Sequence, residues 1–248
     1  MLEVRGLSRR FGSIVVFGGV DVDLRAGEVL GLIGPNGAGK STFINCVTGS
    51  LAPDSGTVSF DGVPVIGRRP DQFSRMGLAR TFQDPRLLEH RTAFENVLLG
   101  RRVKYGVVEL ARLGQGRRSR AHEERVVLEV LDQVGCRHLA DIRAGSLSAG
   151  QQRLVSVARA MAGSPRCLLL DEPAAGLNDT ETAALLENLR IIRGTGVAIL
   201  LVEHHMGLVM EVCDRVTVLA NGGVIAEGAP DEVRRDPEVI RSYLGSAA

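Results

Sequence analysis

The stretch Gly34-Pro35-Asn36-Gly37-Ala38-Gly39-Lys40-Ser41 lies between two segments of different character. Residues 28–33 before it are mostly apolar, as in a strand of a parallel sheet that is covered on both faces. Residues 40–48 after it carry apolar side chains at helical spacing and stop at a glycine. The stretch fits the pattern G-x-x-x-x-G-K-[ST] in the strand-to-helix context that this pattern requires. We therefore predict a phosphate-binding loop.

The residue types of this loop suit a phosphate group. Glycines let successive backbone N–H groups converge on phosphate oxygens, and the following helix adds its positive N-terminal end. Lys40 supplies a compact charge for the β- and γ-phosphates, and the Ser41 hydroxyl is a ligand for Mg²⁺. A glycine-rich turn without a ligand is the alternative, and the eight matching positions argue against it.

A second apolar run, Cys167 to Leu170, is followed by Asp171, Glu172 and Pro173. Open parallel sheets bind ligands beyond the carboxyl ends of their strands, so both carboxylates are expected near the loop. Asp171 is then the residue to hold Mg²⁺, through water, and Glu172 the one to polarise an attacking water molecule. Pro173 is expected to keep Glu172 in extended backbone. Without the loop, a surface turn would explain the segment equally well.

Leu147-Ser148-Ala149-Gly150-Gln151 precedes a helical pattern that runs to Met161. Ser148 and Gln151 form an S-x-x-Q capping box, which by itself predicts only a well-capped helix. A helix start with a free hydroxyl and a glycine N–H is also an anion site. Its phosphate must differ from the one at residues 34–41, and a second subunit is a source of it.

The order of strands and helical patterns predicts an α/β fold. Residues 1–28 and 57–65 carry short β-branched runs broken by glycines, which indicates a small N-terminal antiparallel layer. Residues 84–164 have helical spacing instead. We expect one domain, residues 1–248, with an α-helical sub-domain at about residues 84–164 inserted into a core of residues 1–83 and 165–248.

Composition narrows the function further. The 30 basic and 29 acidic residues give a net charge of +1, so the protein has no strong electrostatic field to attract nucleic acid or anionic lipid. No stretch approaches the roughly 18 apolar residues of a membrane span. Four cysteines without a C-x-x-C pair favour a reduced, cytosolic protein. Residues 101–120 hold seven basic residues and one acidic residue, which we interpret as a solvated, partly mobile face.

Together the motifs resemble those of the ATP-binding cassettes of ABC transporters. The loop at 34–41, Gln83, the 147–151 signature, the Asp171-Glu172 pair and His204 occur in the order and rough spacing of such cassettes, over nearly the whole chain. Residues 77–83, 171–178 and the C-terminal tail look like those of LivG-type cassettes of branched-chain or hydrophobic amino acid importers.

The resemblance implies a P-loop NTPase core of the RecA-like type and a head-to-tail dimer that traps two ATP molecules with Mg²⁺. The implied ATP contacts within one subunit are Phe11, on the adenine, and Gly34, Pro35, Asn36, Gly37, Ala38, Gly39, Lys40, Ser41 and Thr42. The signature residues that reach ATP in the other subunit are Leu147, Ser148, Ala149, Gly150 and Gln151. The implied metal site is Ser41, Gln83 and Asp171, and the implied catalytic residues are Glu172, His204 and Gln83.

Four residues depart from the commonest cassette pattern. Ala149 replaces a glycine, Asn178 an aspartate, Phe11 a tyrosine, and His205 the aspartate that often follows the histidine. Ser148 and Gly150 still provide a hydroxyl and an open N–H, so the signature remains usable. We favour His204 over His205 because it directly follows the acidic residue at a strand end, and we expect His205 to be solvated. A half-buried core position is the alternative for Phe11.

The resulting hypothesis is the ATPase subunit of an importer, peripheral on the cytoplasmic side of the membrane. Its expected partners are a second cassette, identical or similar, integral permease subunits and, indirectly, a solute-binding protein. The alternatives are a cassette for another small solute, a soluble ABC ATPase of DNA repair or translation, a GTP-binding switch and a silent regulatory cassette. The absence of an N-K-x-D motif disfavours the GTP-binding switch. The absence of long coiled coils and of an excess of basic residues disfavours the soluble ATPase of DNA repair or translation. The presence of Asp171, Glu172 and His204 disfavours the silent cassette.

Overall fold

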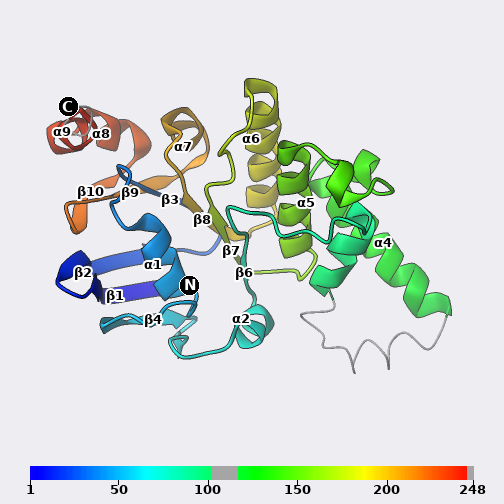
Figure 1. The fold of residues 1–248 in the computed structure, drawn as a ribbon, viewed down its shortest axis with the longest axis horizontal. Coiled ribbons are helices and arrows are strands. Elements are labelled where there is room, and N and C mark those ends of the chain that lie inside the picture. The colour runs from blue at the N-terminus through cyan, green and yellow to red at the C-terminus, as the bar shows by residue number, and fades with distance from the viewer. Residues whose placement is uncertain (102–116, 245–248) are drawn as a thin grey trace.

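A six-stranded sheet runs through the centre of the computed structural model, which describes residues 1–101 and 117–244 (Figure 1). Its strand order is β10-β9-β3-β8-β7-β6. The four strands β6, β7, β8 and β3 are parallel neighbours, as is β9 beside β3, and β10 pairs antiparallel with β9. The bounds are β3 Val29–Ile33, β6 Leu78–Arg80, β7 Cys167–Asp171, β8 Ala198–Val202, β9 Arg215–Ala220 and β10 Gly223–Gly228.

A second sheet confirms the predicted antiparallel layer. Its order is β2-β1-β4-β5, and all three pairings are antiparallel. The strands are β1 Leu2–Phe11, β2 Ile14–Leu24, β4 Ser55–Phe60 and β5 Val63–Pro64. With the parallel core and its helices, this layer confirms the predicted α/β fold class.

The central strands are covered on both faces, as their apolar character predicts. Every residue of β3, β7 and β8 is buried. Because successive side chains of a strand point to opposite faces, Leu168 and Leu170 pack with the helices of one cluster. Cys167 and Leu169 pack on the other side, with α1 and the antiparallel layer.

Helices fill the connections between strands. Figure 1 shows α4 and α5 together on one side of the sheet, in the part of the chain expected to form the helical sub-domain; the exact boundaries of that sub-domain stay a prediction. The bounds are α1 Lys40–Val47, α2 Pro70–Met76, α4 Arg117–Gln133, α5 Ala149–Met161, α6 Asp179–Gly194, α7 Met206–Val212, α8 Pro230–Arg235 and α9 Pro237–Leu244, with short 3-10 turns at Arg137–Leu139 and Ala144–Ser146. None of the helices within residues 1–101 and 117–244 is long and apolar enough to cross a bilayer.

The basic segment 101–120 needs one correction. Arg101 is buried, and its guanidinium pairs with the Glu123 carboxylate of α4 at 2.6 Å. This residue therefore ties the chain before residue 102 to α4 and is not solvated. Residues 102–116 lie outside the described part of the chain, and the predicted solvated face falls mostly there.

The four cysteines are free and buried. Burial raises the pKa of Cys46 to about 11 and the pKa values of Cys136, Cys167 and Cys213 to about 12, because the thiolate would lose its hydration. These side chains therefore behave as small apolar residues of the two core clusters.

Candidate functional site

The loop at 34–41 connects β3 to α1 and surrounds a small cavity. The cavity has a volume of about 220 Å³ and is lined by Val16, Glu172 and residues 36–42. Gly34 is required here, because its φ is 154° and a Cβ would lie 2.0 Å from the carbonyl oxygen of Leu219. Gly39 has a φ of 94°, and a Cβ there would lie 2.7 Å from Val16. The glycines thus let the backbone curl tightly against its neighbours.

Lys40 is buried inside this loop although it is charged. Its ammonium donates hydrogen bonds to the carbonyl oxygens of Gly34 at 2.6 Å and Pro35 at 3.1 Å. Burial lowers the pKa of Lys40, while the negative charges of Glu172, Glu203 and Asp171 act in the opposite direction. A phosphate group in the cavity would satisfy this ammonium better than neutral carbonyls, since charge-assisted hydrogen bonds are stronger.

Asp171 and Glu172 lie at the carboxyl end of β7, as predicted, but the backbone of Glu172 is not extended. Its φ is 46°, in the left-handed region, so the expectation based on Pro173 is wrong. The Glu172 N–H donates to the carbonyl oxygen of Val202 at 2.9 Å. This bond to β8 and the anchoring of Ala174 described below outweigh the local preference of a residue before proline. Strain of this kind is typical of functional sites.

Two of the predicted side chains, Gln83 and His204, lie beside a third, the Glu172 carboxylate. The Gln83 amide donates to Glu172 Oε2 at 3.2 Å, and His204 Nδ1 lies 4.0 Å from Oε1. Gln83 follows β6, Glu172 follows β7 and His204 follows β8, and these strands are parallel neighbours. Their carboxyl ends therefore bring the three side chains to one edge of the sheet, beside the loop that follows β3.

The two histidines have different roles in the structure. His205 caps α7, because its Nδ1 accepts the Leu208 N–H at 3.2 Å. Both imidazoles are exposed, and His204 is the one within reach of Glu172. The geometry therefore favours His204, in agreement with the sequence-based choice.

Glu203 is a residue of the site that the sequence analysis did not single out. Its carboxylate has no exposed surface and accepts the N–H of Ala174 at 2.7 Å, of His204 at 3.0 Å and of His205 at 3.3 Å. One buried carboxylate thus ties the chain after Glu172 to the chain around His204. An acidic residue at the end of an apolar strand was the only signal for this role.

We expect Glu203→Gln to lower the free energy of unfolding by about 1–3 kcal/mol, because one end of an amide cannot accept and at least one buried N–H loses its partner. Chemical denaturation of both proteins measures this change. Glu211→Gln on α7 is the matched control, since Glu211 is exposed and pairs only at the surface. Equal unfolding free energies for Glu203→Gln and the native chain would contradict this role.

The 147–151 segment forms the predicted capping box at the start of α5. Ser148 Oγ accepts the Gln151 N–H at 3.2 Å, and Gln151 Oε1 accepts the Ser148 N–H at 3.0 Å. The hydroxyl is not free, however, because it donates to Glu181 of α6 at 3.1 Å. None of residues 147–151 lines the cavity of the loop at 34–41. An anion at this helix start therefore has to come from elsewhere.

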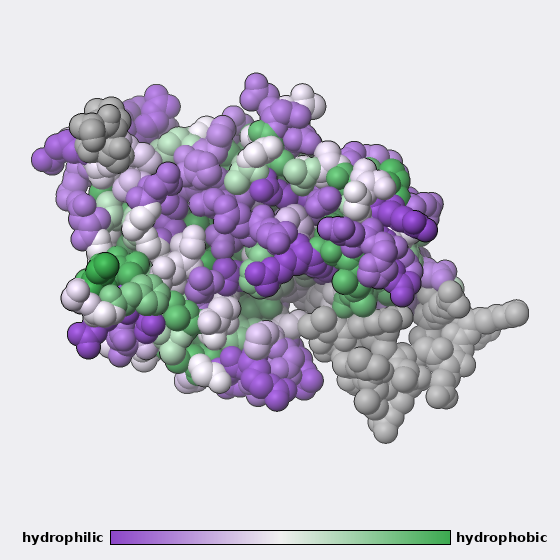
Figure 2. All heavy atoms as spheres, viewed as in Figure 1, coloured by the Kyte–Doolittle hydropathy of each residue, from purple (hydrophilic) through white to green (hydrophobic). Residues whose placement is uncertain are grey.

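Phe11 lies at the end of the β1–β2 hairpin and is 49% exposed. Figure 2 shows hydrophobic side chains gathered over this end of the molecule, where Ile14 and Val15 are also exposed. The Arg9 guanidinium covers the Phe11 ring at 4.7 Å from its centre. Val16 of the same hairpin lines the loop cavity and Phe11 does not, so adenine stacking on Phe11 stays a prediction.

The donor set fits Mg²⁺ bound together with a phosphate. Magnesium is usually held by one or two carboxylates, with water and substrate phosphates completing its shell. Ser41 is exposed to the cavity and Asp171 lies at the adjoining strand end. Within residues 1–101 and 117–244 no group of three or more His, Cys, Asp or Glu side chains could hold a metal by itself. The Ser41 hydroxyl and the Asp171 carboxylate are the groups here that fit a magnesium ion bound together with a phosphate.

Comparison with known proteins agrees with this geometry. A family model described as "ABC transporter" matches residues 17–175, more than half of the chain. The chain belongs to the ABC transporter family. A second model, "Branched-chain amino acid ATP-binding cassette transporter", matches residues 224–248. The cassette is 40% identical to the high-affinity branched-chain amino acid transport ATP-binding protein BraF of Pseudomonas aeruginosa, over 100% of this chain and 98% of that protein.

Solved structures of other cassettes share the fold. An ATP-binding cassette of an ABC transporter in its ADP conformation has a TM-score of 0.84 and 30% identity, over 99% of this chain and 98% of that chain. A bacterial ABC transporter cassette solved as a dimer has a TM-score of 0.79 and 25% identity, over 93% and 99% of the two chains.

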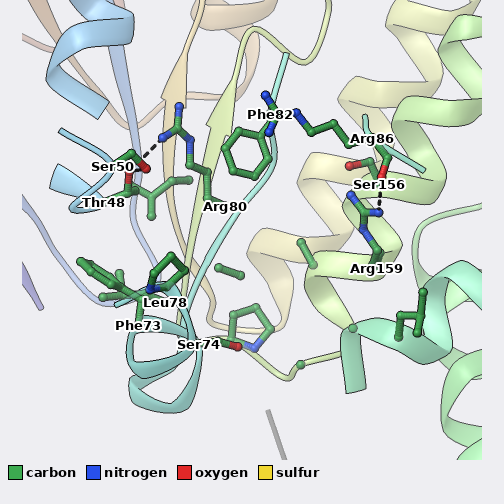
Figure 3. Close-up of a pocket in the computed structure, with 18 of the residues that line it drawn as sticks. Thr48, Ser50, Phe73, Ser74, Leu78, Arg80, Phe82, Arg86, Ser156 and Arg159 are labelled. Carbon is green, nitrogen blue, oxygen red and sulfur yellow. Dashed lines mark hydrogen bonds between the residues drawn. The ribbon is translucent and has the colours of Figure 1, made fainter. Parts of the chain in front are cut away.

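The cassette also contains a groove that the sequence analysis did not predict. It has a volume of about 460 Å³ and lies between α2 and β6 on one side and α5 on the other. Figure 3 shows Phe82 between Arg80 and Arg86, whose guanidiniums lie 4.8 Å and 5.1 Å from the ring centre. Arg159 of α5 donates to the carbonyl oxygens of Pro85 and Arg86 at 2.6 Å and 2.9 Å. The segment after Gln83 is thus fastened to the helix that begins at the signature.

Proposed function

We propose that this cassette is the ATP-hydrolysing subunit of an importer for branched-chain or related hydrophobic amino acids. The meeting of Gln83, Glu172 and His204 beside the Lys40 loop carries the proposal, because it combines phosphate binding with a carboxylate for water activation. The family match at residues 224–248 and the branched-chain transport relative support the substrate class.

In this proposal Gln83 has two tasks and each of the other residues has one. The Lys40 ammonium and the backbone N–H groups of the loop bind the β- and γ-phosphates of ATP. Ser41 and Asp171, with Gln83, would hold Mg²⁺, and the ion would supply positive charge to offset that of the phosphates. Glu172 polarises the attacking water, Gln83 orients the carboxylate through its hydrogen bond, and His204 contacts the γ-phosphate. Phe11 stacks on the adenine.

The proposal includes a head-to-tail dimer with a second cassette, identical or similar. The capped start of α5 does not line the phosphate cavity of its own subunit, which supports contact with ATP held by the other subunit. The structure of a related bacterial cassette is dimeric, which supports a dimer of cassettes. ATP then favours the closed dimer and hydrolysis favours the open one, so nucleotide binding selects between two states.

Integral permease subunits are the further partners in this proposal, and the groove beside Gln83 is their docking surface. It is lined by apolar side chains such as Phe73, Leu78 and Leu88, together with Arg80 and Arg86. The Ser156 hydroxyl, also in its wall, is buried and has no hydrogen-bond partner among residues 1–101 and 117–244. A protein segment with apolar and acceptor groups suits this surface. In this proposal the docked cassette lies peripherally on the cytoplasmic side of the membrane.

Two measurements test the function. The purified cassette is expected to release phosphate from ATP, and deletion of its gene is expected to abolish high-affinity uptake of leucine, isoleucine and valine, with glucose uptake as the control. Absence of ATP hydrolysis would contradict the enzymatic role. Unchanged uptake of all three amino acids would contradict the substrate class and favour a cassette for another small solute.

We expect Leu88→Asp to abolish copurification with membrane subunits while leaving the ATPase rate of the isolated cassette unchanged. Leu88 is 41% exposed and lines the groove, so a carboxylate there blocks docking without disturbing the core. Ile191→Asp on α6 is the matched control, because Ile191 is also 41% exposed and lies outside the groove. Affinity purification from membranes measures the difference, and equal recovery of membrane subunits with both variants would contradict the docking surface.

A further inference from the structure

Arg80 connects the groove to the carboxylate that we assign to the Mg²⁺ site. It is the last residue of β6, the strand beside β7. One arm of its guanidinium donates to Asp171 Oδ2 at 2.8 Å, and the other donates to Thr48 Oγ1 at 2.8 Å. Thr48 is the C-cap residue of α1, the helix that begins at Lys40. Figure 3 shows Arg80 reaching from the groove wall toward Thr48.

The ion pair between Arg80 and Asp171 is almost fully buried. The two side chains are only 10% and 8% exposed, so water screens the pair little. A fork that bonds two elements at once has few alternative conformations, and it fixes the carboxylate it contacts. Removing one member of such a pair leaves the other charge buried and uncompensated.

The charge of Arg80 also matters because three carboxylates crowd this edge of the sheet. Burial lowers the pKa of Lys40, and the charges of Glu172, Glu203 and Asp171 act in the opposite direction. Arg80 offsets one of these charges, that of Asp171, and it lines the groove and not the cavity of the nucleotide loop. It leaves the second Asp171 oxygen for the water shell of Mg²⁺.

We propose that Arg80 is a positioning residue for ATP hydrolysis, which holds Asp171 in the orientation that turnover requires and limits the negative charge at the metal site. The proposal rests on the ATPase function described above. Arg80 acts through Asp171 and does not touch the nucleotide. A purely structural role differs from this one in its consequences. In this proposal, replacing Arg80 lowers turnover but strengthens Mg²⁺ binding.

The test compares Arg80→Gln, Arg80→Lys and the control Arg75→Gln, whose exposed guanidinium pairs with Asp71 on α2. We expect Arg80→Gln to lower kcat by about tenfold or more, because the Asp171 carboxylate loses its orientation. The half-saturating Mg²⁺ concentration is expected to fall by about threefold, because removing a nearby cation strengthens the attraction for Mg²⁺. Binding of fluorescent ADP without Mg²⁺ is expected to stay within about twofold, because Arg80 does not contact the phosphates in this proposal.

Arg80→Lys separates charge from geometry. A lysine restores the half-saturating Mg²⁺ concentration, but its single ammonium cannot bond Thr48 and Asp171 as a fork does, so kcat recovers only in part. If Mg²⁺ dependence and kcat of Arg80→Gln match those of Arg75→Gln, the proposal is wrong. If Mg²⁺-free ADP binding, Mg²⁺ affinity and thermal stability all fall together, Arg80 is structural and the proposal is also wrong. A native cassette that does not hydrolyse ATP would instead refute the proposed function, independently of these variants.

Discussion

The Glu172→Gln cassette is expected to bind MgATP with native affinity and to release phosphate about a hundredfold more slowly, or slower still. Glutamine keeps the shape of the side chain and the hydrogen-bonding position beside Gln83, but it cannot accept a proton from water. The Glu172 side chain lies at the loop cavity and next to His204, so no other carboxylate described here is as well placed to replace it. Steady-state phosphate release and equilibrium binding of a fluorescent ATP analogue measure the two quantities.

The same variant should accumulate the ATP-bound dimer, because hydrolysis is the step that reopens it. Size-exclusion chromatography with MgATP detects this species. Glu187→Gln makes the identical chemical change at an exposed position of α6 and should behave like the native chain. Normal turnover in Glu172→Gln would remove Glu172 from the mechanism, and the role of general base would have to pass to another group.

Lys40→Ala is expected to weaken ATP binding by about 10- to 100-fold, the range for loss of a hydrogen bond to a charged group. Lys40 is the buried cation of the loop, and its ammonium is already held beside the cavity by the carbonyl oxygens of Gly34 and Pro35. Its removal takes away the charge that meets the phosphates and the hydrogen bonds that the ammonium donates to these two carbonyl oxygens. Isothermal titration with ATP gives the affinity directly.

A surface arginine provides the control for this substitution. Arg190→Ala on α6 also removes one positive charge, but Arg190 is half exposed and pairs only with Glu187 and Glu211. Its ATP affinity should equal that of the native cassette. An unaltered affinity in Lys40→Ala would mean that the loop at 34–41 does not hold the phosphates of ATP.

The phosphate loop could be predicted because its chemistry is local. Gly34, Gly39 and Lys40 lie within a few residues of one another, so their spacing alone carries the backbone geometry and the charge. The capping box at Ser148 and Gln151 is equally local and is confirmed. The alternation of apolar strands and helical patterns was also sufficient to predict the α/β class. The spacing of apolar residues within each element shows whether it is a helix or a strand and which of its faces is buried.

Contacts between distant segments could not be predicted in the same way. The Arg80 side chain meets an aspartate 91 positions away, and the groove forms where α2 and β6 face α5. No residue of this set carries a distinctive local pattern. The conformation of Glu172 was predicted wrongly for a related reason, because hydrogen bonds from Glu172 and Ala174 to the β8 segment outweigh the influence of Pro173.

Residue types and short spacings were therefore enough to predict a phosphate loop, two carboxylates at a strand end and a capped helix. The order of strands β3, β8, β7 and β6 then decided which of these groups meet. Parallel neighbours end at one edge of a sheet, so Gln83, Glu172 and His204 gather beside Lys40 although they are far apart in the chain. The pairing of Arg80 with Asp171 arises from the same packing, because each of these two buried charges would be uncompensated without the other.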